Sequence, residues 1–126
     1  MAVLGAAAGG GGGGITPTIS FLGSQSWTPS YDMEAYVYVI GGVGSGCAGN
    51  NQHDFLSGGG AGGCAVSIVT LVNGTEYTVT VGAAGRHSTK ILPQNNVGGG
   101  NGGNTSFAGS GVTTLTGNGG TGGTAT

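Results

Sequence analysis

Few side chains in this chain could do chemistry, and the first candidate is a glycine motif. The stretch "GSGCAG", Gly44 to Gly49, fits the G-x-G-x-x-G spacing of a dinucleotide-binding loop. Such a loop needs a helix directly after it, because the phosphate sits on the helix N-terminus. The following "NNQHDFLSGGG" has no helical period, and no acidic residue stands about twenty positions further on. We therefore expect no nucleotide site here.

A second candidate is the pair His53-Asp54 with Ser57 nearby, since these are the residue types of a hydrolase. Neighbours in an extended chain point to opposite sides, so His53 and Asp54 do not form a relay. The chain also has no G-x-S-x-G motif. We interpret "GNNQHDF" as a polar loop and predict that the protein is not an enzyme and has no cofactor.

Cys47 and Cys64 are the only cysteines. We expect two reduced thiols, because the N-terminus lacks the positive region of a secretory signal and disulfides are rare inside cells. A disulfide between the two cysteines stays an open alternative. A zinc site made of Cys47, Cys64 and His53 would lack a fourth ligand and the C-x-x-C spacing, so we predict no metal.

Positive side chains gather at one place only, where Arg86, His87 and Lys90 lie in "GRHSTKILPQNN". This cluster is either a solvated loop end or a contact for an acidic partner or a sugar.

The aromatic residues Trp27 and Tyr31 leave open a binding role and a structural role. They could stack on a sugar, whereas a single tryptophan in a small β domain more often lies in the core.

Charge is scarce, which excludes whole classes of partner. The chain has 126 residues with two Lys or Arg, four Asp or Glu and a formal net charge of −2. Two cations cannot neutralise a run of phosphates, so we predict no nucleic-acid binding and no polybasic membrane contact. No apolar run approaches the ~20 residues of a spanning helix, so we predict no membrane insertion. We expect synthesis in the cytoplasm of a cell, because the N-terminus lacks a secretory signal.

Two segments divide the chain. Residues 1–15 are rich in Ala and Gly and are predicted to stay out of any core, as a flexible leader or as a thin arm in a groove on a partner, with Val3, Leu4 and Ile15 as its contacts. Residues 16–126 are predicted to form one glycine-rich β domain.

Strand patterns fill the second segment. "TISFL" at 18–22 is a first strand, and "EAYVYVI" at 34–40 is apolar on both faces and therefore central. "CAVSIVTLV" and "TEYTVTV" flank Asn73-Gly74, which predicts a hairpin with a type I′ turn. Short strands are expected at 105–107 and 112–116, and no segment has a helical period. The fold class is thus all-β, a small β-sandwich-like unit with little or no helix.

Glycine, 33 residues of 126, follows a period of three in "GGAGGC" (59–64), "GGNGGN" (99–104) and "GGTGGT" (119–124). A left-handed helix with three residues per turn and a rise of ~3.1 Å aligns every third residue in a column. We predict short polyglycine II-type segments that bond to their neighbours, since such helices have no internal hydrogen bonds. Ordering so much glycine costs much entropy, which favours a homo-oligomer, most simply a trimer, or docking on a larger assembly.

The order of these motifs resembles a known family. "YVIGGVGSG", "GGGAGG", "VNGTEYTVTVGAAG" and "GGGNGGNTSF" follow one another as in the glycine-rich domain of bacteriophage virion proteins, mainly tail fibres and receptor-binding tips. The resemblance covers roughly Ser26 to Phe107. It implies packed polyglycine helices and display on the virion surface, with other capsid or tail proteins as partners.

Two functions follow from the resemblance as expectations. The first is a small decoration, cement-type or fibre-associated protein that is anchored by the N-terminal arm. The second is a fibre-tip adhesin that binds a glycan or outer-membrane protein of the host. The candidate receptor contacts are Asn50, Asn51, His53, Arg86, His87 and Lys90.

Overall fold

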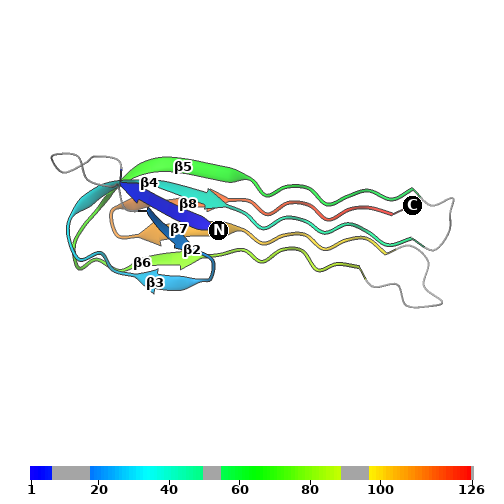
Figure 1. Ribbon diagram of the computed structural model, residues 1–126, viewed down its shortest axis with the longest axis horizontal. Helices are drawn as coiled ribbons and strands as arrows, with labels where there is room; N and C mark the ends of the chain where they lie inside the picture. The colour runs from blue at the N-terminus through cyan, green and yellow to red at the C-terminus, as the bar shows by residue number, and fades with distance from the viewer. Residues whose placement is uncertain (7–17, 50–54, 89–96, 126) are drawn as a thin grey trace.

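A computed structural model describes residues 1–6, 18–49, 55–88 and 97–125 of the chain. β-Strands gather at one end of the molecule, and glycine-rich segments extend from them side by side toward the other end (Figure 1). The described residues contain no helix, and hence none that could cross a bilayer. The all-β prediction is therefore confirmed.

Eight strands form two antiparallel sheets of four strands each. The first sheet has the order β2-β1-β4-β5 and consists of β1 (Ala2–Ala6), β2 (Thr18–Phe21), β4 (Met33–Ile40) and β5 (Cys64–Leu71). The second sheet has the order β3-β6-β7-β8 and consists of β3 (Gln25–Trp27), β6 (Tyr77–Thr80), β7 (Thr105–Gly109) and β8 (Val112–Gly117).

Strand β4 is central, as its apolar faces predict, since it pairs with β1 on one side and with β5 on the other. Its odd residues Ala35, Val37 and Val39 are buried, while Tyr36 and Tyr38 are each 41% exposed. This alternation follows from the period of two in a strand.

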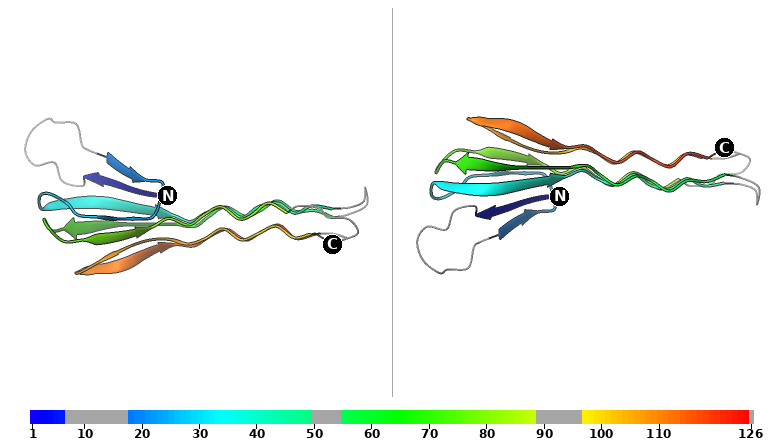
Figure 2. Two further views of the ribbon diagram at one scale, coloured as in Figure 1. Left: turned by 90° about the horizontal axis from the view of Figure 1, so that it is seen from below. Right: turned by 90° about the horizontal axis from the view of Figure 1, so that it is seen from above.

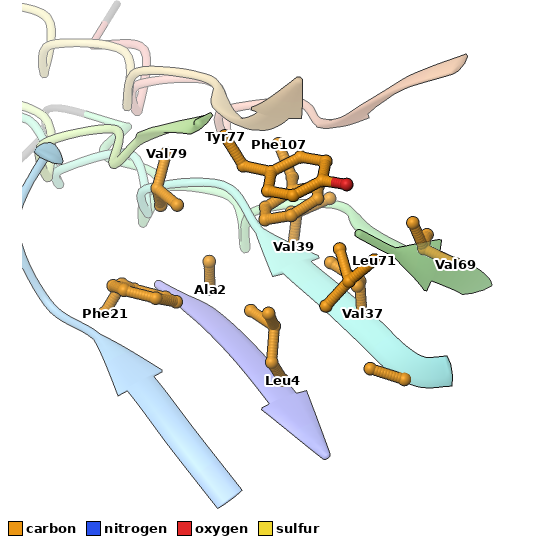
Figure 3. Close-up of a cluster of buried hydrophobic side chains, with 11 residues drawn as sticks. Ala2, Leu4, Phe21, Val37, Val39, Val69, Leu71, Tyr77, Val79 and Phe107 are labelled. Atoms are coloured by element: carbon orange, nitrogen blue, oxygen red, sulfur yellow. The ribbon is translucent and has the colours of Figure 1, made fainter. Parts of the chain in front are cut away.

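The core lies between the two sheets (Figure 3). It combines aliphatic side chains of the first sheet with aromatic side chains of both sheets, and the rings of Tyr77 and Phe107 stack with centroids 5.5 Å apart. The hydroxyl of Tyr77 accepts a hydrogen bond of 2.9 Å from the backbone N–H of Val72. Trp27 packs against this core, and its ring meets that of Phe21 edge to face, which favours the core role of Trp27 over sugar stacking.

The prediction that the first residues stay out of the core is wrong. Strand β1 lies between β2 and β4, with Leu4 opposite Ile19 and Val37. Leu4 is 3% exposed and Ala2 is fully buried, so neither side chain can contact a partner. The physical reason is that a strand of small residues fits in a narrow core, where backbone pairing on both sides holds it. Val3 lies opposite Ser20 and Tyr38, and Ile15 lies outside the described residues.

The predicted hairpin around Asn73-Gly74 is also wrong. The turn exists, because Thr75 N–H donates to Val72 O and Gly74 has a φ of 79°. However, Asn73 lacks the positive φ that a type I′ turn requires. Its N–H instead donates to Asp32 Oδ1, and β5 and β6 enter different sheets. The turn therefore connects the two sheets and does not close a strand pair.

Candidate functional site

Five glycine-rich segments extend the strands, and we name them rods 1 to 5. They are rod 1 (41–48), rod 2 (57–63), rod 3 (82–88), rod 4 (97–104) and rod 5 (118–124). Rods 1, 3 and 5 continue β4, β6 and β8 outward, and rods 2 and 4 return to β5 and β7. Rods 1, 2 and 3 form one layer and rods 4 and 5 form a second (Figure 2).

Hydrogen bonds between the rods repeat every three residues. In rod 1 the N–H groups of Gly41, Gly44 and Cys47 donate to rod 2, and those of the next column donate to rod 4, namely Gly42 to Gly103, Ser45 to Gly100 and Ala48 to Val97. This period is that of a helix with three residues per turn. The predicted polyglycine II-type segments are confirmed.

Close backbone contact explains why the rods consist of glycine. A Cβ at Gly44 would lie 1.9 Å from the Thr121 carbonyl oxygen, and one at Gly62 would lie 2.0 Å from that of Gly41. No side chain fits at these positions. Several non-glycine residues of the rods occupy columns that face outward, such as the exposed Ala61 and Thr121.

Two of the outward side chains bond back to the rods. The amide oxygen of Asn101 accepts from Gly122 N–H at 2.7 Å, and that of Asn104 accepts from Gly119 N–H at 2.9 Å. Both bonds join rod 4 to rod 5. The third residue of the G-G-N repeat thus supplies an acceptor for the neighbouring rod.

Replacing Asn104 with Ala is expected to lower the free energy of unfolding by about 1 kcal/mol, because the Gly119 N–H loses its acceptor. Urea denaturation checks this value. Asn118→Ala is the control, since Asn118 is exposed and its side chain accepts no bond from another rod among the described residues. Equal losses in the two variants would contradict the role of Asn104.

The cysteines differ in their surroundings. Both are free, and Cys64 is exposed at the start of β5. Cys47 lies in rod 1, where its Sγ is 3.2 Å from the carbonyl oxygens of Ser57 and Thr124. The open alternative of a disulfide is thus not realised. In the described part of the chain, no three His, Cys, Asp or Glu residues gather as they would around a metal.

Thiol titration of the native protein is expected to proceed in two phases. Cys64 should react at once with a colorimetric disulfide reagent, and Cys47 more slowly, because its Sγ contacts two carbonyl oxygens between packed rods. Cys64→Ser should remove the fast phase alone. Absence of any reaction before reduction would indicate a disulfide and would contradict this arrangement.

The remote end of the rods is the candidate functional site. The chain reaches it at Gly49 and leaves it at Phe55, and again at Ser88 and Val97. An isolated antiparallel β-bridge pairs Ala48 with Val97, and another pairs Leu56 with Ala125. The rods are thereby held together up to their last described residues. Eight residues of rod 1 reach about 25 Å beyond β4.

Several predicted contact residues lie near this end. Arg86 and His87 are exposed in rod 3, and the carbonyl of Arg86 accepts bonds from the Ser45 hydroxyl and from Gly100 N–H. Asn50, Asn51, His53 and Lys90 lie outside the described residues. In the sequence, 50–54 joins rod 1 to rod 2, and 89–96 joins rod 3 to rod 4.

Sequence reasoning missed two residues of this end. Phe55 is 80% exposed and Leu56 is 52% exposed. The signal was present, because "FL" is a pair of large apolar residues in a polar and glycine-rich stretch without a strand pattern. The "GSGCAG" stretch begins in rod 1, where Gly44 packs against the backbone of rod 5.

The family model of the glycine-rich domain matches residues 18–126. No curated protein and no solved structure matches the chain.

Proposed function

The chain belongs to the glycine-rich domain family, and from this membership and its rods we propose that it is a bacteriophage virion surface protein that contacts the host cell through the remote end of the rods. The single observation that supports this function is the rod lattice, which carries exposed side chains away from the two sheets.

Rigidity favours recognition at this end. Rod 1 bonds to four other rods, and Ser88 Oγ donates to Gly46 O at 3.2 Å near the remote end. A contact residue on such a support loses little entropy when it binds, which improves affinity. Exposed Phe55, Leu56, Arg86 and His87 offer apolar area, a cation and hydrogen-bond donors. These groups suit a glycan or the loops of an outer-membrane protein.

Attachment to the particle uses another surface than the one expected from the sequence. Leu4 is buried and cannot anchor the protein, which removes one of the three arm contacts on which the decoration-type function depended. The outer face of the first sheet exposes Tyr36 and Tyr38 of β4 beside Ile68 and Val66 of β5. This face carries one charged side chain, the exposed Glu34 of β4, and lies remote from the rod ends; it is the better candidate for contact with other virion proteins.

The test begins with location. Antibodies against the purified protein are expected to label purified phage particles in electron micrographs. Absence of the label from these particles would refute a virion role. Purified protein is then added to host cells before the phage. It should compete for adsorption, whereas the double variant Phe55→Ser, Arg86→Ala should not.

Matched controls separate contact from folding. Thr121→Ala and Asn118→Ala change exposed residues on the flank of rod 5 and should compete as well as the wild type. Equal competition by the double variant and the wild type would refute recognition through the rod ends. The competition experiment tests recognition alone, and the antibody labelling tests the location on the virion separately.

A further inference from the structure

Rod 1 uses four of its six hydrogen-bonding directions within the described residues. A rod with three residues per turn presents three columns of N–H groups and three columns of C=O groups, in six directions. Two N–H columns donate to rods 2 and 4. Two C=O columns accept, since Gly42 and Ser45 take bonds from rod 5 and Val43 takes one from Gly85 of rod 3.

The unused C=O column contains Gly41 and Gly44, whose oxygens accept no N–H among the described residues. Rod 2 has a matching row of N–H donors beside these oxygens. The Cα atoms of Gly59 and Gly62 pack against the oxygens, and the N–H groups of the same two residues have no acceptor among the described residues. Acceptors of rod 1 and donors of rod 2 thus border the same open lattice position. An exposed row of this kind resembles the edge of a sheet, which pairs with a further strand.

Side chains block only part of this position. Val43 is 53% exposed, and one turn further out its column contains Gly46, where a Cβ would meet nothing closer than the Ser57 carbonyl oxygen at 4.0 Å. One turn beyond Val43, at Gly46, rod 1 therefore borders the position with its backbone alone. From residue 44 to residue 49 it runs for about 19 Å.

We propose that the open lattice position beside rods 1 and 2 receives residues 9–14 of a second copy of this chain as an added rod. These are six consecutive glycines and would also reach about 19 Å. No other run of pure glycine in the chain is as long. Glycine suits the position, because at Gly44, Gly62 and most other rod glycines a Cβ would come within 3 Å of the backbone of a neighbouring rod.

Connectivity excludes the chain's own bundle as the acceptor. Met1 bonds to Ile40 at the junction with the rods, and β1 runs from there away from them to Ala6. Residues 7–17 join Ala6 to Thr18, which lie on adjacent strands at the opposite end of the sheet. Half of these eleven residues extend less than about 20 Å, and the distal part of rod 1 lies further away. The contact therefore joins different copies head to tail, which generates a chain of copies.

Sedimentation velocity over a concentration series tests the proposal. The wild type is expected to form a ladder of oligomers, and Gly46→Val should raise the concentration of half-association at least ~10-fold by filling the open position. Thr121→Val is the matched control, since it places the same side chain on an exposed position of the other rod layer. Equal unfolding midpoints of the variants exclude a folding defect.

The glycine run gives a second and independent test. Single Gly→Ala substitutions at residues 9–14 should weaken association with a period of three, because only one column of a docked rod points its Cα atoms at a neighbour. In the wild type, amide exchange at Gly59 and Gly62 should slow as oligomers form. The proposal is wrong if the wild type stays monomeric at all concentrations, if Gly46→Val associates like the control, or if all six substitutions act alike.

Discussion

Gly44→Ala is expected to destroy the rod bundle and most of the stability of the protein. The added Cβ would lie 1.9 Å from the carbonyl oxygen and 2.4 Å from the carbonyl carbon of Thr121, both backbone atoms of rod 5. A shift of rod 1 would break its backbone hydrogen bonds, because it bonds to four other rods. We expect a loss of about 4 kcal/mol or more in the free energy of unfolding, a large part of the usual total. Urea denaturation measures this loss in the free energy of unfolding, and calorimetry checks it independently.

Gly58→Ala is the matched control for this prediction. A Cβ at Gly58 meets no atom within 4 Å, and its φ is not positive. The variant should keep its stability or gain up to about 1 kcal/mol, since alanine restricts the unfolded chain. If Gly44→Ala and Gly58→Ala unfold at the same urea concentration, the close packing of rods 1 and 5 is contradicted.

Leu4→Ala is expected to cost about 2–5 kcal/mol, as for other leucines of a core. Leu4 is 3% exposed in the middle of the first sheet, opposite Val37 of β4, so its removal leaves a cavity. The effect separates a core strand from a free N-terminal arm. Thermal unfolding of the two proteins, with the transition followed by the fluorescence of Trp27, is the measurement.

Leu22→Ala controls for the general effect of losing a leucine. Leu22 is 78% exposed directly after β2, and its truncation should change the free energy of unfolding by less than about 0.5 kcal/mol. Should Leu4→Ala be as mild as Leu22→Ala, the placement of β1 in the core would be wrong.

The sequence predicted the parts of the fold that follow from a local period. Alternation in "EAYVYVI" gives the two faces of β4, and the period of three in "GGNGGN" gives rod 4 with its outward Asn101 and Asn104. Both depend on the geometry of one segment alone, since a strand repeats every two residues and a polyglycine II helix every three.

Contacts between residues that are far apart in the sequence could not be predicted in the same way. Asn73-Gly74 indicates a hairpin locally, but a bond from Asn73 to Asp32, 41 residues away, ties the turn to another loop. Strand β1 shows almost no strand pattern, because Ala and Gly contribute little side-chain contact and pairing with β2 and β4 defines it. For the site, Arg86 and His87 stood out by charge, whereas Phe55 and Leu56 did not fit any pattern.

Amide hydrogen exchange along rod 1, measured residue by residue in dilute protein, tests the central claim that the glycine segments form a bonded lattice. The account predicts two slow amides in every three: Gly44, Ser45, Cys47 and Ala48 are protected, and Val43 and Gly46 exchange fast. Fast exchange at all six positions would show that the rods are not bonded to one another, and would contradict the account.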